Sequence, residues 1–208
     1  KQAIALNPGF AEAHNNLGVT LQGLGRLEEA QASYRQAIAL NSNFAEAHSN
    51  LGGTLRELGR LQEAELSCRQ AVALESDSAL AHSDLGLLLR ELGKLEEAQA
   101  SYTHAIALQP DFAGAHNSLG GTLRELGRLE EAQLSYRQAI ALESDFALAY
   151  SNLGVTLKDL GRLEEAGASC RQAIALQPDF AGARYNLGML LFESGQYQAA
   201  AEQFALVD

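Results

Sequence analysis

The sequence predicts an all-α fold, an α-α superhelical solenoid of 34-residue helix–turn–helix repeats. The first observation behind this prediction is a Leu-Gly pair that returns every 34 residues, at Leu17-Gly18, Leu51-Gly52, Leu85-Gly86, Leu119-Gly120, Leu153-Gly154 and Leu187-Gly188. The second is composition, since 47% of the residues are hydrophobic but only 6% are aromatic and only three are proline. A period of this length is typical of helix pairs that bury their apolar faces by stacking on their neighbours.

The first helix of each repeat is predicted from side-chain spacing. In the first full repeat, ring and leucine side chains recur three or four residues apart, at His14, Leu17, Leu21 and Leu24. This spacing places them on one face of an amphipathic helix. Gly25 then ends the helix, because glycine readily adopts the positive φ found just past a helix end.

The second helix follows at once. Glu28 and Glu29 stand in its first turn, where acidic side chains favour the helix dipole. Its predicted inward face is Leu27, Ala30, Tyr34, Ala37 and Ile38. After each second helix a Ser or Pro precedes an Asp or Asn, as in Pro110-Asp111. Proline cannot continue a helix, and we expect the Asp or Asn to cap the next one.

These units predict a single solenoid domain over residues 1–208. Its full repeats are 11–44, 45–78, 79–112, 113–146 and 147–180, preceded by the tail of a repeat at 1–10 and followed by a partial repeat at 181–208. Neither end has a polar capping helix, which solenoids need for solubility. We therefore expect a segment of a longer chain whose copies associate end to end through exposed apolar groups, namely Phe192, Tyr197, Phe204 and Val207.

The residues at fixed repeat places carry a resemblance. A glycine at the eighth place, Ala at the twentieth, an aromatic at the twenty-fourth and Ala at the twenty-seventh are Gly18, Ala30, Tyr34 and Ala37 in the first repeat. This pattern resembles the tetratricopeptide repeat (TPR), and the resemblance covers the whole chain. Cys68 and Cys170 depart from it by replacing the aromatic residue. The bulky fourth place is held by His14, His48, His82, His116, Tyr150 and Arg184.

Several classes of function are excluded or disfavoured. The net charge of −11 argues against a nucleic-acid partner, because phosphate binding needs a basic face. No apolar stretch is long enough to span a membrane, and the start of the chain does not resemble a signal peptide. Cys68 and Cys170 lie three repeats apart, too far to bridge, so we expect reduced thiols and a cytoplasmic protein.

Catalytic, metal and cofactor sites are not expected either. The in-register histidines are one repeat apart, whereas zinc needs several ligands at about 2 Å. The remaining place for function, as the resemblance implies, is a concave wall lined by the first helices. Its candidate ligand-binding residues are Asn15, Asn16, Asn50, Arg56, Asp84, Arg90, Asn117, Arg124, Asn152, Lys158 and Asn186.

An asparagine amide can pair with both the N–H and the C=O of an extended peptide, so this wall would bind main chain. Glycines would leave room for a ligand at Gly53, Gly114, Gly121 and Gly182, and apolar anchors would stand at Leu80, Leu87, Leu148 and Val155. The alternative is that the polar side chains are simply solvated. On the binding hypothesis, replacing Asn50, Asn152 and Asn186 with Ala weakens the binding of a partner without lowering the melting temperature of the protein.

The first hypothesis is thus a protein-interaction scaffold that binds a peptide or protein segment. The second is a substrate-recruiting arm of a larger enzyme, because the asparagine ladder and the run Ala-His-Ser-Asn-Leu-Gly at 47–52 resemble the TPR arm of O-linked N-acetylglucosamine transferases. A third is an idealised repeat protein without a natural ligand, against which the irregular drift between repeats argues.

Overall fold

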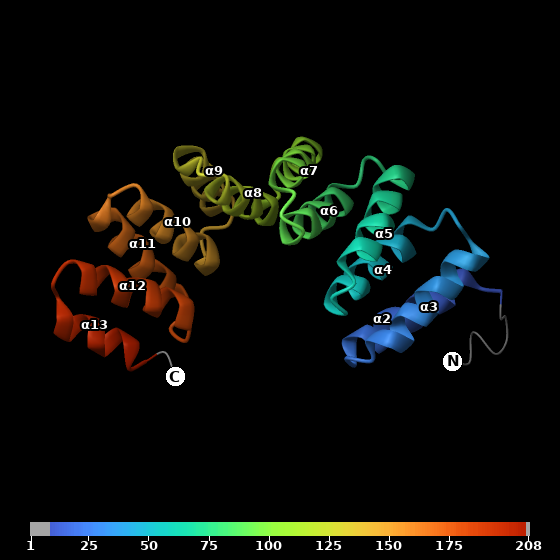
Figure 1. Ribbon diagram of the computed structural model, residues 1–208, viewed down its shortest axis with the longest axis horizontal. Helices are drawn as coiled ribbons and strands as arrows, with labels where there is room; N and C mark the ends of the chain where they lie inside the picture. The colour runs from blue at the N-terminus through green and yellow to red at the C-terminus, as the bar shows by residue number, and fades with distance from the viewer. Residues whose placement is uncertain (1–8, 207–208) are drawn as a thin grey trace. The chain divides into compact units, whose positions relative to one another are not determined.

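The computed structural model describes residues 9–206, and the regular structure in this range is entirely α-helical (Figure 1). Residues 1–8 of the expected repeat tail, including Pro8, lie outside the described residues. Val207, which was expected to be exposed, also lies outside them. The helices divide between two compact units, with the boundary between Gln109 and Pro110. No helix within residues 9–206 combines the length and apolarity needed to cross a bilayer.

Each unit contains six helices in the described residues. The first unit has α2 (Ala11–Gly23), α3 (Leu27–Leu40), α4 (Ala45–Glu57), α5 (Leu61–Leu74), α6 (Ala79–Glu91) and α7 (Leu95–Leu108). The second has α8 (Ala113–Glu125), α9 (Leu129–Leu142), α10 (Ala147–Asp159), α11 (Leu163–Leu176), α12 (Ala181–Glu193) and α13 (Tyr197–Phe204). Each even-numbered helix pairs with the helix that follows it as a hairpin, as α2 does with α3. Within each unit the hairpins stack in sequence order, which is the predicted all-α solenoid of helix pairs.

Close packing within each hairpin depends on the glycine at the eighth repeat place. A Cβ on Gly18 would lie 2.5 Å from Tyr34 Cε1, and one on Gly120 would lie 2.8 Å from Tyr136 Cε1. Both tyrosines are buried. The glycine therefore provides the space in which the large ring of the twenty-fourth place packs. Where that place holds Cys68, the thiol contacts Gly52 in the same way.

The turn between the two helices of a hairpin requires a left-handed residue. Gly25 has φ 71° and Gly127 has φ 76°, a region that residues with a Cβ seldom adopt. The following N–H group turns back to close the helix, as when Arg26 N–H donates to the Leu21 carbonyl at 2.9 Å. The predicted role of Gly25 is confirmed.

The predicted capping of the first helices is wrong. Their N-cap residue is a phenylalanine in five of the six described repeats, as at Phe112, and no side-chain cap bond forms there. Asp111 lies one residue too early, so its backbone carbonyl accepts from Ala113 N–H at 3.0 Å instead. Only Ser78, among the described first helices, caps with its side chain, by accepting from Ala81 N–H.

Most fourth-place side chains form a hydrogen bond with a backbone carbonyl in the loop that precedes their own helix. The Nε2 atoms of His48 and His82 lie 3.1 Å from the carbonyl oxygens of Ser42 and Ser76, which can only accept. His116 has the same contact with the carbonyl of Pro110. Arg184 donates from Nε to the Pro178 carbonyl at 2.9 Å. An arginine can thus replace histidine at this place, as expected for a structural hydrogen bond.

Candidate functional site

The candidate residues lie on the surface of the first helices, which we call the first-helix face. It comprises the fifth, sixth, ninth, twelfth and thirteenth repeat places of α2, α4, α6, α8, α10 and α12. Asn16 is exposed, whereas Asn15 is 1% exposed and therefore cannot face a ligand without rearrangement. The remaining candidates are half-buried, namely Asn50, Arg56, Asp84, Arg90, Asn117, Arg124, Asn152, Lys158 and Asn186.

The amides of this face join neighbouring repeats. Asn50 Nδ2 donates to Asn15 Oδ1 at 3.1 Å, and Asn152 Nδ2 donates to Asn117 Oδ1 at 3.0 Å. In the last repeat Asn186 Nδ2 donates to Ser151 Oγ at 3.1 Å. Each bond runs from the sixth place of one repeat back to the fifth place of the repeat before it. Since each amide nitrogen has two N–H groups, one of them and the carbonyl oxygen are not used in this bond.

This ladder changes the expectation for alanine variants. Removing Asn50, Asn152 or Asn186 deletes a hydrogen bond between repeats, which contributes about 1 kcal/mol in a typical protein. The melting temperature should therefore fall as well. Loss of a partner in such variants cannot by itself distinguish a binding role from a structural one.

The cationic side chains at the twelfth place are paired too. Arg56 Nη1 lies 2.8 Å from Glu91 Oε1 in the next repeat. Lys158 Nζ lies 2.9 Å from Glu193 Oε1, and Arg124 Nη1 lies 3.5 Å from Asp159 Oδ2. Exposed pairs of this kind contribute about 0–1 kcal/mol each. The acidic partners thus compensate the positive charges of these basic side chains within the protein.

Asp84 interrupts the amide ladder. A carboxylate has no hydrogen to donate, so the bond between repeats is reversed and Ser49 Oγ donates to Asp84 Oδ2 at 3.1 Å. Burial raises the pKa of Asp84, although the Ser49 hydrogen bond and the charge of Arg56 act in the opposite direction. Among the described residues no Lys, Arg or His forms an ion pair with this carboxylate. Asp84 is therefore a half-buried negative charge without a paired cation.

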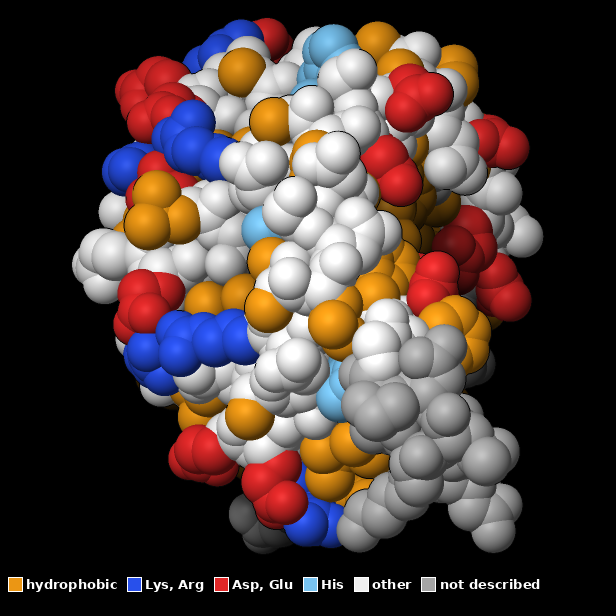
Figure 2. Space-filling model, turned by 90° about the vertical axis from the view of Figure 1, so that its right-hand side faces the viewer, with side chains coloured by type: hydrophobic (Ala, Val, Ile, Leu, Met, Phe, Trp, Pro, Cys, Tyr) orange, Lys and Arg blue, Asp and Glu red, His pale blue; other side chains and the backbone are white. Residues whose placement is uncertain are grey.

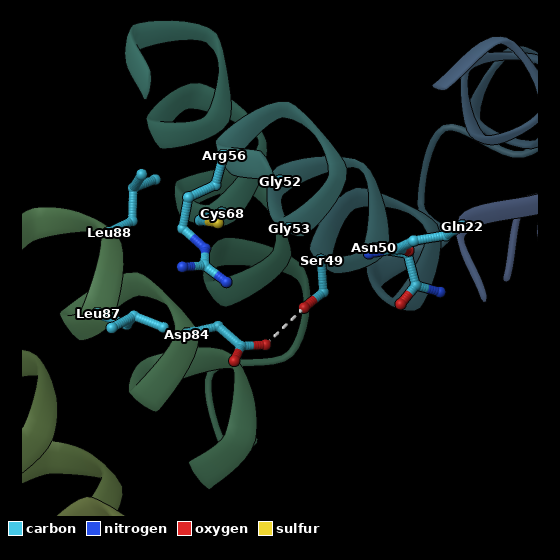
Figure 3. Close-up of a pocket in the computed structure, with 10 residues that line it drawn as sticks. All are labelled: Gln22, Ser49, Asn50, Gly52, Gly53, Arg56, Cys68, Asp84, Leu87 and Leu88. Carbon is cyan, nitrogen blue, oxygen red and sulfur yellow. Dashed lines mark hydrogen bonds between the residues drawn. The ribbon is translucent and has the colours of Figure 1, made fainter. Parts of the chain in front are cut away.

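A small hollow opens beside Asp84 between the second and third full repeats. It has a volume of ≈ 130 Å³, and its lining residues are Gln22, Ser49, Asn50, Gly52, Gly53, Arg56, Cys68, Asp84, Leu87 and Leu88. Figure 3 shows the Arg56 side chain and the Asp84 carboxylate extending into the same space, with Leu87 and Leu88 at one side. A Cβ on Gly53 would contact nothing within 4 Å, so the ninth place of this repeat is open.

A hollow at matching repeat places occurs in the second unit. It also measures ≈ 130 Å³ and is lined by Gly154, Val155, Lys158, Tyr185, Asn186, Met189 and Leu190. The eighth, ninth and twelfth places of one repeat and the sixth, ninth and tenth places of the next contribute to both hollows. The chemistry differs, because the second hollow has Val155 in place of Gly53 and the neutral amide of Asn186 in place of the charged Asp84.

The structure brings together some predicted residues and adds others. Arg56 and Asp84 line one hollow with the predicted open place Gly53, and Lys158 and Asn186 line the other with Val155. Sequence reasoning missed Cys68, Leu88 and Leu190. Cys68 belongs to a second helix and reaches the hollow because Gly52 has no side chain in the way. The sequence signal for this was the combination of Gly52 at the eighth place with the small residue Cys68 at the twenty-fourth.

The two cysteines are structural. Both are free and buried. Removal from water raises the pKa of the Cys68 thiol to about 12 and that of Cys170 to about 11. Low-pKa thiolates are the reactive form of cysteine, so neither residue has the character of a nucleophile. Within residues 9–206 no three His, Cys, Asp or Glu side chains gather closely enough to hold a metal ion.

The predicted apolar end needs one correction. Phe192 and Tyr197 are 53% and 64% exposed, as expected. Phe204 is half-buried instead, because it occupies the twenty-fourth place and packs against Gly188, whose Cβ would lie 2.5 Å from its Cε1. Its ring centroid lies 5.8 Å from that of Tyr185. Association of copies through this end stays a prediction, which sedimentation at several concentrations would test.

Comparison with protein families places repeat models along the chain. A model described as TPR repeat matches residues 23–59 and 120–161. Models described as Tetratricopeptide repeat match residues 1–32, 45–78, 83–140, 147–180 and 169–202. Together these ranges include nearly every residue. Comparison with curated protein sequences finds no match.

Solved structures show the same architecture. YrrB, described as a TPR protein with an unusual peptide-binding site, is 25% identical with a TM-score of 0.70, over 94% of this chain and 96% of YrrB. TTC0263, a thermophilic TPR protein of Thermus thermophilus, is 27% identical with a TM-score of 0.70, over 88% of this chain and 100% of TTC0263. A chain of the APC/C hetero-tetramer Cut9-Hcn1 has a TM-score of 0.85 at 17% identity, over 99% of this chain and 41% of that one, which shows the fold alone.

Proposed function

Because the chain belongs to the tetratricopeptide-repeat family, whose repeats mediate binding to proteins and peptides, we propose that its first-helix face binds an extended protein segment. The segment lies across the first helices, and its side chains enter the hollows between repeats. The sixth-place amides supply hydrogen bonds to its main chain. The chain itself contributes binding and no chemistry.

The observation that carries this proposal is the recurrence of the side-chain-sized hollow. Hollows of ≈ 130 Å³ form at the same repeat places in both units, between the second and third full repeats and between the fifth and sixth. Each hollow has room for a side chain of an extended peptide, in which alternate side chains point to the same side. Asn50 and Asn186 line these hollows, and each amide keeps one N–H and its C=O outside the bond between repeats, which main-chain recognition requires.

Support also comes from YrrB, which is similar over nearly its whole length and is described as having a peptide-binding site. That description applies to YrrB, and its extension to this chain is part of the proposal. The first-helix face here is neither a basic clamp nor a flat apolar patch. Its cations are paired within the protein, which leaves amides, Asp84 and apolar side chains to contact a ligand.

The test places a larger side chain in each hollow. Gly53→Leu adds a side chain where a Cβ meets nothing within 4 Å, and Val155→Trp enlarges the side chain already in the second hollow. The probe is a library of random peptides selected for binding to the unmodified chain. A selected peptide should bind at least one of the two variants about tenfold more weakly, the loss expected for about 1.4 kcal/mol.

The matched control adds the same bulk elsewhere. Ala100→Leu changes an exposed place on a second helix that already holds Leu66 and Leu134 in other repeats. Its peptide affinity should equal that of the unmodified chain, as measured by fluorescence anisotropy. Equal affinity of all four proteins for every selected peptide would contradict binding on the first-helix face, and failure to select any peptide would contradict peptide binding itself.

A substrate-recruiting arm of a larger enzyme is the second hypothesis, and it concerns the same surface. It is supported by the asparagines at the sixth place, Asn16, Asn50, Asn152 and Asn186, which resemble the ladder of O-linked N-acetylglucosamine transferase arms. In that case the bound segment is the enzyme's protein substrate. The reading frame that contains this sequence distinguishes the two hypotheses, because the second requires an attached nucleotide-sugar-binding domain.

A further inference from the structure

We propose that the first unit binds a lysine or arginine side chain of its extended ligand in a second, larger hollow at the junction of α4, α5 and α6. This inference rests on the proposed function and adds the chemistry of the partner, a protein segment that carries a basic residue. The hollow has a volume of ≈ 340 Å³, and it shares Ser49, Asn50 and Asp84 with the smaller hollow of Figure 3.

The walls of this hollow suit a long side chain with a charged tip. One part of the lining is apolar, from Ala45, Ala71, Leu80 and Ala81. Leu80 is 61% exposed, so an aliphatic stem can cover it. Lysine and arginine bury such stems along apolar surface while their charged ends contact polar groups. The polar part of the lining consists of Ser49, Asn50, Ser78 and three carboxylates.

Those carboxylates, Glu46, Glu75 and Asp84, are the only charged side chains that line the hollow. None of them forms an ion pair with a Lys, Arg or His of the described chain. Glu46 accepts a hydrogen bond from the Asn15 amide and Asp84 accepts one from Ser49, and both donors are neutral. The nearby Arg56 is paired with Glu91, which leaves the hollow negative.

Helix dipoles do not reverse this charge. The N-termini of α4 and α6 open at the hollow and contribute roughly half a positive charge each, whereas the C-terminus of α5 contributes roughly half a negative charge. Three full carboxylate charges outweigh that sum. The burial that raises the pKa of Asp84 also means that its charge is poorly solvated. A cation placed beside it would therefore be favoured.

A metal ion does not match the arrangement. Metal binding needs ligand oxygens converging on one point, and no such group of three acidic, His or Cys side chains exists within residues 9–206. Carboxylates spread along a hollow of this size match a side chain that passes them and ends among them. The guanidinium group offers five N–H donors and the ammonium group three, enough for more than one of these acceptors.

This combination of acids is specific to one junction. The places of Glu46, Glu75 and Asp84 are held by Gly114, Glu143 and Asn152 between the fourth and fifth repeats. Between the fifth and sixth repeats they are held by Leu148, Gln177 and Asn186, with no acid at all. The negative hollow therefore belongs to the first unit, and it does not follow from the repeat pattern or from the overall charge.

The test repeats the random-peptide selection on two variants of the full chain. The first variant, Glu46→Gln with Glu75→Gln and Asp84→Asn, removes the three charges while keeping the side-chain shapes and the acceptor for Asn15. The control variant, Glu28→Gln with Glu96→Gln and Glu130→Gln, removes as many charges from exposed second-helix sites. Circular dichroism melting establishes that both variants fold.

The expected result is enrichment of Lys or Arg at one peptide position on the unmodified chain and on the control, and its loss on the first variant. Replacing that Lys or Arg by norleucine in a selected peptide should weaken binding to the unmodified chain about tenfold or more, since charged hydrogen bonds are lost. Selected peptides without a basic position, or basic peptides that bind the first variant equally well, would overturn this inference and leave the proposed function standing. If no peptide is enriched, both fail.

Discussion

The two units of the chain have closely similar interiors and different binding faces. In the first unit Tyr34 and Tyr102 fill the space beside Gly18 and Gly86, and in the second unit Tyr136 and Phe204 do the same beside Gly120 and Gly188. Each unit also contains one hairpin in which cysteine replaces the ring, at Cys68 and Cys170. The packing that holds the hairpins together is thus repeated in kind.

The first-helix faces diverge over the same backbone. At the junction of the second and third repeats, Asp84 and Arg56 line a polar hollow next to a larger acidic one. At the junction of the fifth and sixth repeats, Val155, Met189, Leu190 and Tyr185 line an apolar hollow of the same size. Side chains that point into a hairpin are constrained by close packing, whereas those on the face are less tightly packed and differ more between repeats.

Charged side chains are also distributed unevenly over the surface. On the face of the molecule in Figure 2, Lys and Arg side chains lie beside Asp and Glu side chains along one edge, while Asp and Glu side chains at the opposite edge have no Lys or Arg next to them. The inter-repeat pairs account for mixed regions of this kind, as between Arg69 and Glu97 at 2.7 Å. Regions with acids alone are where a basic partner would be attracted.

The largest expected effect tests whether the two interiors are equivalent. Tyr34→Ala and Tyr136→Ala each remove a ring that is at most 1% exposed and leave a cavity beside a glycine. Each should lower the free energy of unfolding by about 3–5 kcal/mol, and by similar amounts. Equilibrium denaturation measures both. The matching Tyr→Phe variants, which keep the ring, should lose about 1 kcal/mol or less, and a large loss in one unit alone would show that the interiors differ.

A smaller effect concerns a side-chain hydrogen bond between repeats that is missing at the last junction of the second unit. Arg60 Nη1 donates to Gln31 Oε1, and Arg162 Nη1 donates to Gln133 Oε1, each at 2.7 Å between adjacent repeats. At the last junction these places hold Gln196 and Gly167, and a hollow of ≈ 400 Å³ opens there. Gly167→Gln with Gln196→Arg should restore the bond and stabilise the chain by about 1–2 kcal/mol, part of it from helix propensity.

A double-mutant cycle separates the two contributions to this gain. Each single variant reports propensity and local packing, and only the double variant can form the new bond. A coupling energy of about 1 kcal/mol between the two substitutions, from urea denaturation, is the expected outcome. Strictly additive effects would mean that the last hairpin does not sit at the distance that the other junctions have.

The smallest effect converts the first unit towards the second. Asp84→Asn should let the new amide donate to Ser49, as Asn186 donates to Ser151, and should stabilise the chain by about 1 kcal/mol at neutral pH. Because the pKa of Asp84 is raised in the folded state, its ionisation costs stability as the pH rises through its ordinary range. The gain from Asn should accordingly shrink as the pH falls from the raised folded-state pKa towards about 4, the ordinary pKa of Asp, and stay small below it, where Asp84 is protonated in both states.

Denaturation at neutral and acid pH measures this difference. The reverse variant, Asn186→Asp, is the control in the second unit, and it should lose stability at neutral pH and recover it in acid. A gain from Asp84→Asn that does not depend on pH would show that the charge of Asp84 is not disfavoured in the folded chain.

Much of the fold followed from particular residues. The 34-residue spacing of the Leu-Gly pairs predicted the helix pairs, and Gly25 was correctly expected to adopt a positive φ. The expected capping by Asp111 was wrong because the carbonyl of Phe112, one residue later, accepts the first hydrogen bonds of the helix. The capping preferences of side chains do not predict a helix start to within one residue. Phe204 was expected on the surface, although its place in the repeat put it against Gly188.

The candidate site was predicted only in outline. The sequence indicated that Asn50, Arg56 and Asp84 share one surface, and the hollow beside them contains all three. It did not indicate that Asn50 bonds to Asn15 or that Arg56 pairs with Glu91, because these partners lie 35 residues away on adjacent repeats. Which polar groups remain available to a ligand depends on those pairings.

By itself, the sequence determined the helix pairs, their period and the residues that fill each hairpin, because these follow from local spacing and from the need of a large side chain for a glycine opposite. The tertiary structure alone decided which side chains of the first-helix face are already bonded, where the hollows open and which of them are negative. Those properties arise where two repeats meet, and the distance between atoms on neighbouring repeats is a result of stacking that no single repeat contains.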